Sequence, residues 1–349
     1  MTAGFAVLGA GVIGSSIAYH LARAGARVII YDPNPVAPPS ASWASAGGIR
    51  RQDRDPREWP LAIEAAARWP GLAGELGADL EFRPGGHLHV TEREEALPEL
   101  AARVERERAG GLGVELVDGR RARAIAPLLG PSVVGGVFSA GDGQADPRLV
   151  SEAFRAAAVR QGAEFRRHPI EGGARPAPTT VVAAGSWTAR LLDLPVKPVA
   201  LQMLLSDPCP AVLAPTVGAE ERRLSFKQLP SGEFFIGGGW PAAFDEKSHR
   251  CRVLRESVEG SWRTASELIP ALGERRLARS ICGLEGESPD GVPLIGRLSE
   301  TLYVAAGFSG HGFQLAPAVG RAVADDLLGR PVPELAALSP TRARAERRP

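Results

Sequence analysis

The chain has 349 residues, of which 44% are hydrophobic and 23% charged, and this ordinary globular usage excludes a mostly disordered chain, a collagen-like repeat and a coiled coil. The length suggests two domains. Lys and Arg total 41 against 40 Asp and Glu, a net charge of +1, so no overall basic field exists to attract nucleic acid or an anionic membrane surface.

The cysteines and histidines do not form a metal-binding pattern. Cys209, Cys251 and Cys282 are widely spread, which predicts no disulfide framework and favours a reducing compartment. His87 and His89 alternate on one expected strand without a third ligand, so we expect them to be structural and expect no metal site. No apolar run approaches the roughly 20 residues of a membrane span, and we expect no signal peptide before the first apolar segment. We expect a cytoplasmic protein.

A strand–helix–strand unit opens the chain. Gly4–Leu8 is a short apolar run that predicts a buried strand, and the turn GAGVIG of residues 9–14 follows it. Apolar residues then recur at helical spacing as far as Ala24. Arg27–Tyr31 is a second apolar run and is followed by Asp32. This order of elements is typical of a dinucleotide-binding unit.

The later segments alternate between helical and strand patterns. Amphipathic helices are expected at Glu58–Leu76, Glu94–Arg108, Asp146–Gln161, Arg250–Ile269 and Leu315–Leu328. Strands are expected at His87–Thr91, Glu164–Arg167, Thr180–Ala184, Val196–Leu205, Arg223–Gln228, Glu233–Gly238 and Leu302–Ala306. Ser40–Arg51 is small and glycine-rich, and we expect no packed element there.

The glycine turn has the spacing GxGxxG, which suits a pyrophosphate. Gly9 permits a tight turn, Gly11 lets the backbone approach the ligand, and Gly14 lets helix and strand pack closely. The helix N-terminus presents free N–H groups to phosphates, and Asp32 would accept a ribose hydroxyl, which disfavours NADP. The residues expected at the cofactor are Gly9, Gly11, Val12, Ile13, Gly14 and Asp32. The turn alone leaves FAD and NAD open, and a ligand-free turn is the alternative.

Further glycine-rich motifs follow in a characteristic order. They are SWASAGGIR at 42–50, VVAAGSW at 181–187, SPDGVPLIG at 288–296 and AGFSGHGF at 306–313. After an N-terminal GxGxxG, this series resembles the FAD-dependent D-amino-acid oxidase superfamily, which includes glycine oxidase, sarcosine oxidase and the β-subunit of proline dehydrogenase. The resemblance covers nearly the whole chain, and the last motif is most similar to the sarcosine oxidase and proline dehydrogenase branch.

The resemblance implies a mixed α/β fold, in which a Rossmann-like FAD-binding domain carries an inserted antiparallel-sheet substrate domain. The FAD domain would comprise residues 1–50, 140–190 and 278–345, and the substrate domain 51–139 and 191–277. Beyond the first loop, the residues implied at FAD are Ser42, Ala44, Ser45, Ala46, Gly47, Gly48, Ala184, Gly185, Trp187, Gly307, Gly310, His311, Gly312, Phe313 and Gln314. We expect noncovalent FAD, because no His lies in Ser42–Arg51 and Cys282 stands one residue too far from Pro289 for an attachment cysteine.

The resemblance also implies a reaction. Hydride would pass from a carbon next to an amine nitrogen to flavin N5, and the resulting imine would hydrolyse in water. The first expectation is a sarcosine oxidase-like enzyme that oxidises a small amino acid or N-methyl amino acid and reduces O2 to H2O2.

Departures from the family keep other functions open. Relatives have a lysine that promotes the reaction with oxygen where this chain has Phe235, and a carboxylate-holding lysine where it has Gln314. A dye- or quinone-linked dehydrogenase of proline or a D-amino acid is therefore one alternative. A non-catalytic flavoprotein assembly factor and an NAD-dependent dehydrogenase with a simple Rossmann domain are the others.

Each candidate residue at the reacting end also has an alternative interpretation without a role in the reaction. Arg50 and Arg51 are the first choice for binding a substrate carboxylate, since a guanidinium fork matches it; a solvated loop arginine is the alternative. His311 could be a base or, as we favour, could fix its loop by hydrogen bonding. Trp240 could wall the substrate pocket or simply pack. Lys227 could replace the oxygen-promoting lysine or could be an ordinary surface lysine.

Overall fold

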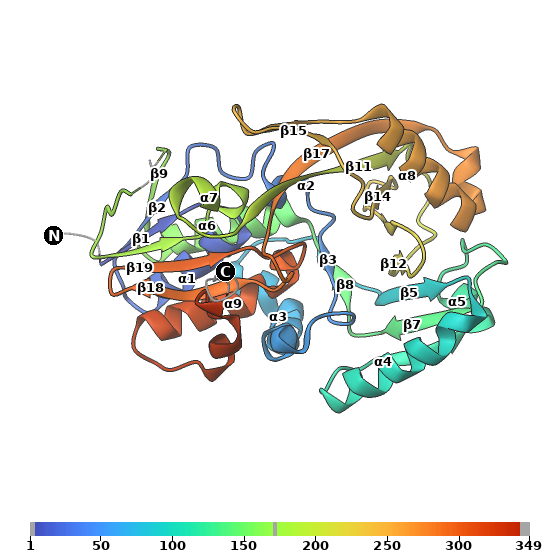
Figure 1. Ribbon diagram of the computed structural model, residues 1–349, viewed down its shortest axis with the longest axis horizontal. Helices are drawn as coiled ribbons and strands as arrows, with labels where there is room; N and C mark the ends of the chain where they lie inside the picture. Colours follow the sequence, from blue (N-terminus) through green and yellow to red (C-terminus); the bar gives the residue numbers. More distant parts are fainter. Residues whose placement is uncertain (1–3, 170–172, 343–349) are drawn as a thin grey trace, which may run out of the picture.

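The computed structural model describes residues 4–169 and 173–342. The ends of the expected FAD-domain segments at 1–3 and 343–345 therefore lie outside the described residues. The chain forms two halves, each built on one large sheet, and passes between them several times (Figure 1).

The first half contains a six-stranded sheet whose strands are mostly parallel. Its order is β18 (Leu294–Ser299), β19 (Leu302–Ala306), β10 (Thr179–Val182), β1 (Phe5–Leu8), β2 (Val28–Tyr31) and β9 (Glu164–Arg166). Only the pairing of β18 with β19 is antiparallel. The strands read as nearly continuous apolar runs because parallel strands are buried on both faces.

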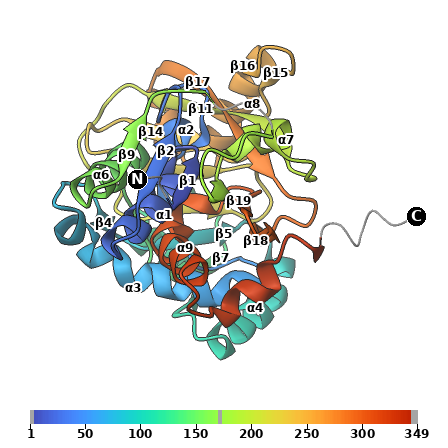
Figure 2. The same ribbon diagram turned by 90° about the vertical axis from the view of Figure 1, so that its left-hand side faces the viewer.

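Long helices cover this sheet. They are α1 (Val12–Arg23), α6 (Pro147–Arg160) and α9 (Gly312–Leu327), with α3 (Trp59–Leu76) packed against α9. Helices α1 and α9 lie side by side in both ribbon views (Figures 1 and 2). Their apolar faces and the strands share one core, which includes Val7, Ile17, Ile30 and Val319.

The second half contains an eight-stranded, mainly antiparallel sheet. Its order is β17 (Leu277–Glu287), β11 (Lys197–Ser206), β14 (Phe234–Gly237), β13 (Ser225–Gln228), β12 (Thr216–Ala219), β5 (His87–Thr91), β7 (Gly135–Ser139) and β6 (Glu115–Asp118). Helices α4 (Leu97–Ala109), α5 (Gly119–Ile125) and α8 (Arg255–Leu268) lie in this half.

The two faces of the second sheet differ in chemistry. Successive side chains on a strand point to opposite faces. Leu88, Val217, Phe226 and Ile236 occupy one face and form a core with residues of α5 and α8. The residues that alternate with them are largely polar or glycine and face the first half of the molecule.

Short elements lie where the chain passes between the two halves: α2 (Ala41–Ala44), β3 (Gly48–Ile49), β4 (Arg83–Pro84), β8 (Gly143–Gln144) and α7 (Thr188–Leu191). A separate two-stranded sheet, β15 (Ala243–Asp245) and β16 (Arg250–Arg252), lies in the chain between β14 and α8. The sequence predicted no packed element at 40–51, but α2 forms there because the Ser40 hydroxyl accepts a hydrogen bond from the Trp43 backbone N–H.

Among the expected boundaries that differ from the structure, two change the element or sheet to which a segment belongs. The expected helix at Arg250–Ile269 begins at Arg255, since the residues before it form β16 and pair with β15. The expected FAD-domain segment beginning at 278 starts with most of β17, which pairs along β11 and so belongs to the second sheet. Within the described part of the chain, no helix is long and apolar enough to cross a membrane.

Candidate active site

A large cavity lies between the two sheets. Its volume is about 1270 Å³, and both halves of the molecule line it. The neighbouring strands β19, β10, β1 and β2 are parallel, so their carboxyl ends meet at one edge of the sheet. The residues that follow each of these strands line the cavity: Gly307, Ala183, Gly9 and Asp32. Such an edge is where open α/β sheets bind their ligands.

Glycine backbone shapes this first wall. Gly9 has φ +108°, and a Cβ added to it would lie 2.3 Å from the Ala183 carbonyl oxygen. A Cβ on Gly14 would lie 2.0 Å from the Gly9 carbonyl oxygen, so Gly14 allows α1 to pack on the turn without lining the cavity itself. Only glycine fits at these two positions.

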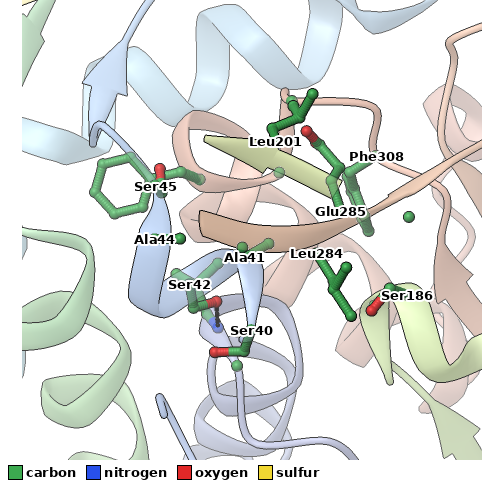
Figure 3. A pocket seen from close by; sticks show the side chains of 18 of the residues that line it. Ser40, Ala41, Ser42, Ala44, Ser45, Ser186, Leu201, Leu284, Glu285 and Phe308 are labelled. Carbon is green, nitrogen blue, oxygen red and sulfur yellow. Dashed lines mark hydrogen bonds between the residues drawn. The ribbon is translucent and has the colours of Figure 1, made fainter. Parts of the chain in front are cut away.

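Polar groups at the start of α1 complete the wall. The Val12 backbone N–H donates to the Ser42 hydroxyl at 3.0 Å (Figure 3). The Asp32 carboxylate accepts from the backbone N–H groups of Ala10 and Asn34, each at 2.8 Å. A helix N-terminus beside a fixed carboxylate offers donors for phosphates and an acceptor for a ribose.

The second wall is the polar face of the eight-stranded sheet. The alternate residues on neighbouring strands that line the cavity are Leu201, Met203, Gly237, Ser225, Lys227, Thr216, Gly218, His87 and His89. We expected the two histidines to be structural, but the period of two residues places both on the cavity face. The sequence pattern already carried this signal.

Lys227 is buried in this wall and has no hydrogen bond or ion pair to any described residue. It pairs across the sheet with Phe235, and its Nζ atom lies 5.9 Å from the centre of the Phe235 ring. Only 4% of Lys227 is exposed. Burial lowers the pKa of Lys227 to about 8.

His87 presents a fixed donor to the same wall. The Gln52 side-chain amide donates to His87 Nδ1 at 3.0 Å and also to the His87 carbonyl oxygen. This bond leaves the ring hydrogen on Nε2. Burial, with Arg50 next in importance, lowers the pKa of His87 well below its ordinary value, so the ring is neutral.

Three linked side chains join Glu58, the residue before α3, through His311 to Arg50, the residue after β3, and the last two line the cavity. His311 Nδ1 lies 2.8 Å from the fully buried carboxylate of Glu58. The other ring nitrogen, Nε2, lies 3.4 Å from Nη2 of Arg50. Burial lowers the pKa of His311 despite the opposing effect of Glu58. A neutral ring that donates to Glu58 and accepts from Arg50 satisfies all three groups.

The comparisons with known proteins agree with this geometry. The family model described as FAD dependent oxidoreductase (DAO) matches residues 5–326. The chain belongs to this family of FAD-dependent oxidoreductases. It is 28% identical to the glycine oxidase of Geobacillus kaustophilus over 350 residues, which covers 92% of this chain and 91% of the relative. It is 27% identical to a D-amino acid dehydrogenase of Agrobacterium fabrum, covering 93% and 95% of the two chains.

Solved structures share the fold of this family. The glycine oxidase of Geobacillus kaustophilus superimposes with a TM-score of 0.88 and 27% identity, covering 98% of this chain and 99% of that one. An L-proline dehydrogenase of P. horikoshii superimposes with a TM-score of 0.91, covering 99% and 98%, and at 24% identity this likeness concerns the fold. The chain therefore has the mixed α/β, Rossmann-like architecture of FAD-dependent oxidoreductases.

The first wall fits FAD. Of the residues predicted at the cofactor, those that line the cavity are Gly9, Gly11, Val12, Ile13, Asp32, Ser42, Ala44, Ser45, Ala46, Gly47, Gly48, Ala184, Gly185, Trp187, Gly307, Gly310, His311, Gly312 and Phe313. These residues come from segments far apart in the sequence. The glycines among them leave the backbone accessible from the cavity, because they carry no side chain. The α1 N-terminus would hold the pyrophosphate and Asp32 the adenosine ribose.

Besides Gly14, three predicted site residues do not line the cavity. Arg51 donates through Nε to the buried carboxylate of Asp142 at 2.7 Å and does not line the cavity, so it is not a free carboxylate anchor. Trp240 packs on Gly260 and donates to the Arg223 carbonyl oxygen, so it does not wall the large cavity.

Gln314, the third of these residues, is 1% exposed and donates to the Ala62 carbonyl oxygen at 2.8 Å. It joins α9 to α3 and does not line the cavity. Helix α9 begins at Gly312 and turns position 314 toward α3, whereas the loop residues before the helix line the cavity.

The described residues show free thiols and no metal cluster. Cys282 lies on the face of β17 that packs with Ala200 and Ala242, and it does not line the cavity. No group of His, Cys, Asp or Glu in the described part of the chain could hold a metal ion.

The sequence analysis missed the supporting residues of the site. Glu58 stands at the start of a predicted helix, and nothing in the local pattern distinguishes it from a solvated acidic residue. Asp53, which is ion-paired with Arg50 and Arg103, and Gln52, which orients His87, lie in an irregular loop without periodicity. Glu285 lies on β17, a strand that was not predicted.

Proposed function

We propose that this flavoenzyme oxidises the C–N bond of a small amino acid or N-methyl amino acid, with a sarcosine oxidase-like reaction as the first choice. The observation that carries the proposal is Arg50, a guanidinium held on the cavity wall beside the loop of Gly310–Gly312. The two relatives above, a glycine oxidase and a D-amino acid dehydrogenase, support the same class of substrate.

Arg50 is suited to bind the substrate carboxylate. Its Nη1 atom donates to the carbonyl oxygens of Gln52 and Asp53, at 2.6 and 2.7 Å, which fixes the guanidinium plane. Nη2 points toward His311 and has further donor capacity. A fixed guanidinium loses little entropy when it binds a carboxylate, which favours it over a flexible cation.

His311 acts as a positioning residue in this proposal. Both ring nitrogens already face partners, Glu58 and Arg50, so the ring is not a free base directed at the substrate. Its role is to fix the positions of the Arg50 guanidinium and of the loop that contains His311. This arrangement favours the loop-fixing role that we preferred from the sequence.

The protein's own contribution to the reaction is orientation and exclusion of water. FAD, when bound, accepts the hydride from the carbon next to nitrogen. Arg50 fixes the carboxylate end of the substrate, and the sheet face bearing Met203 and Leu201 supplies apolar cover. The imine product hydrolyses in water, so no acid–base pair is needed for that step.

Lys227 supports oxygen as the electron acceptor. It stands directly across the sheet from Phe235, the position where relatives were expected to have lysine, and it faces the cavity. A buried ammonium stabilises negative charge that develops on oxygen, and removing such a stabiliser typically slows a reaction by roughly 10²–10³-fold. We therefore favour H2O2 as a product over electron transfer to a quinone.

An anaerobic substrate panel tests the proposal. Sarcosine, glycine, proline and D-amino acids are mixed with the purified holoenzyme, and bleaching of the yellow flavin band shows which amine is oxidised. Peroxide per turnover in air then separates an oxidase from a quinone-linked dehydrogenase. A yellow protein that none of these amines bleaches rejects the proposal and supports a non-catalytic flavoprotein. Release of the yellow colour by acid precipitation tests the noncovalent attachment of FAD.

A further inference from the structure

The cavity contains one acidic side chain that the proposed function does not use. Three acidic residues line it: Asp32, Asp53 and Glu285. Asp32 accepts two backbone N–H groups, and Asp53 is ion-paired with Arg50 and Arg103. Among the described residues, Glu285 has neither a hydrogen bond nor an ion pair. A carboxylate enclosed without a partner is costly unless a ligand supplies one.

The position of Glu285 puts it beside the reacting end of the cavity. Figure 3 shows Glu285 on the same side of β17 as Leu201 and Phe308, whereas Leu284 points to the opposite side, toward Ser186. A Cβ added to Gly310 would lie 3.6 Å from Glu285 Oε1. Gly310 is followed by His311, the ring that faces Arg50. One short loop thus separates the unpaired carboxylate from the carboxylate-binding guanidinium.

We propose that Glu285 is a binding site for the protonated amine of the substrate and takes one proton from it before the C–N bond is oxidised. This inference rests on the proposed function, because it assumes that the ligand is an amine. The step is a proton transfer: R–NH3⁺ and the Glu285 carboxylate become R–NH2 and the Glu285 carboxylic acid. The lone pair of the neutral amine can then assist the departure of hydride from the neighbouring carbon. An ammonium ion has no lone pair and cannot do so.

The electrostatics of Glu285 suit a proton acceptor. Burial, with a smaller contribution from the Glu287 carboxylate, raises the pKa of Glu285 to about 7. On β11 the paired residue Val199 and its neighbour on the same face, Leu201, are uncharged, and the loop beside the carboxylate contributes Phe308 and Gly310. Lys197 pairs with Glu287 two residues further along. Within the described residues, Glu287 is the charged group that acts on Glu285.

Two ligands that cannot be oxidised separate this inference from the proposed function. 2-Aminoisobutyrate has an ammonium group and a carboxylate but no hydrogen on the carbon between them. Pivalate has the same shape with a methyl group in place of the ammonium. Calorimetric titration of the holoenzyme in two buffers of different ionisation enthalpy gives the affinity and the number of protons released for each ligand.

The expected result follows from the sign of the pKa shift. At pH 6 the Glu285 carboxyl is mostly protonated in the empty site, so binding an ammonium releases about one proton per ligand. At pH 8 the carboxylate is already ionised, and the release falls toward zero. Pivalate should release none at either pH. Glu285→Gln should abolish the release at pH 6 and weaken 2-aminoisobutyrate on the order of 30-fold or more, with little effect on pivalate.

The matched control is Glu287→Gln, a neighbouring carboxylate on the same strand that does not line the cavity. This variant should keep most of the proton release, with a small decrease at pH 6 because the Glu287 carboxylate contributes to the raised pKa of Glu285. Both variants should retain the yellow flavin spectrum. A release that persists in Glu285→Gln, or a wild-type holoenzyme that fails to prefer 2-aminoisobutyrate over pivalate, overturns the inference. These outcomes do not depend on turnover, whereas the bleaching panel alone decides the proposed function.

The pH dependence of turnover tests the proton transfer itself. For any amine that bleaches the flavin, kcat/KM of the wild type should rise with pH through the pKa of Glu285. In Glu285→Gln the rise should move to the higher pKa of the free ammonium ion, with a loss of roughly 10²–10⁴-fold near pH 7. A rise that stays at the same pH in the variant contradicts the proton transfer.

Discussion

The two walls of the cavity recognise their ligands by different means. The first wall, at the ends of β19, β10, β1 and β2, is built from backbone and glycine, with Asp32 as its fixed carboxylate. The second wall, on the polar face of the eight-stranded sheet, is built from side chains such as Lys227 and His87. Replacing a residue of the first wall obstructs space, whereas replacing one of the second changes charge and leaves the backbone in place.

This difference explains why the cofactor is easier to identify than the substrate. A turn that needs glycine at Gly9 and Gly14 admits no other residue, so the requirement is visible in the sequence. A strand position such as Lys227 tolerates many residues, and its function depends on which neighbours the sheet brings to it.

Gly9→Ala should remove the first wall's function altogether. The new Cβ would meet the Ala183 carbonyl at 2.3 Å in a backbone conformation that L side chains rarely adopt, so the turn must move. We expect a protein purified without yellow colour that does not regain it with added FAD. Gly25→Ala is the matched control, because Gly25 also has positive φ but its Cβ would meet open space. A yellow Gly9→Ala protein would show that the turn does not hold the cofactor.

Arg51→Leu should reduce stability rather than substrate binding. Removing one partner of a buried ion pair typically costs about 3–5 kcal/mol, and loss of the Arg51 guanidinium leaves the buried Asp142 carboxylate without its counter-charge. Burial already raises the pKa of Asp142, so the loss should be smaller at pH 4, where the carboxyl gains its proton more readily, than at pH 8. Urea unfolding at both pH values measures the difference. Addition of Asp142→Asn should recover part of the loss, and equal losses at both pH values contradict the assignment.

Arg50→Leu, one residue earlier, should instead weaken substrate binding and change stability little. It removes a charge-assisted contact to the ligand, worth roughly 2–5 kcal/mol or about 30- to 5000-fold in KM, while stability changes little by comparison. Arg50→Lys should recover only part of this affinity, since lysine lacks the guanidinium fork. Steady-state kinetics with the best amine from the substrate panel gives KM. An unchanged KM in Arg50→Leu would remove Arg50 from the substrate site.

The contrast between Arg50 and Arg51 shows where sequence analysis reached its limit. The glycine motifs predicted the Rossmann-like sheet and nearly all of the first wall, because backbone requirements fix residue type. The sequence could not choose between two adjacent arginines, since the choice depends on Asp142, which is distant in the chain. Likewise β17 was not expected, and with it Glu285, because its residues mix glycine and charge without a clear period. Its long pairing with β11 supplies the stabilisation that the local sequence lacks.

Lys227→Met, in the second wall, should increase stability at pH 7 although Lys227 is proposed to act in the reaction with oxygen. Burial lowers the pKa of Lys227 from 10.5 to about 8, so the unfolded chain binds more protons than the folded one between these values. Stability therefore falls as pH decreases through this range, and the penalty of about 3 kcal/mol is fully present at pH 7. The variant should be more stable than the wild type at pH 7 and gain nothing near pH 11. Thermal unfolding at both pH values tests this, and a destabilised variant at pH 7 contradicts the buried, unpaired ammonium.

Trp240→Phe should produce the smallest effect and should leave both walls of the cavity unchanged. Trp240 packs on Gly260 of α8, and its indole N–H donates to the Arg223 carbonyl oxygen at 2.9 Å. Phenylalanine keeps most of the packing and loses only this hydrogen bond, which is worth about 1 kcal/mol. KM and kcat for the best amine should therefore match the wild type, with a small drop in the midpoint of thermal unfolding. A changed KM would mean that the large cavity extends to Trp240 when ligand is bound, and the second wall would then be wider than the sheet face alone.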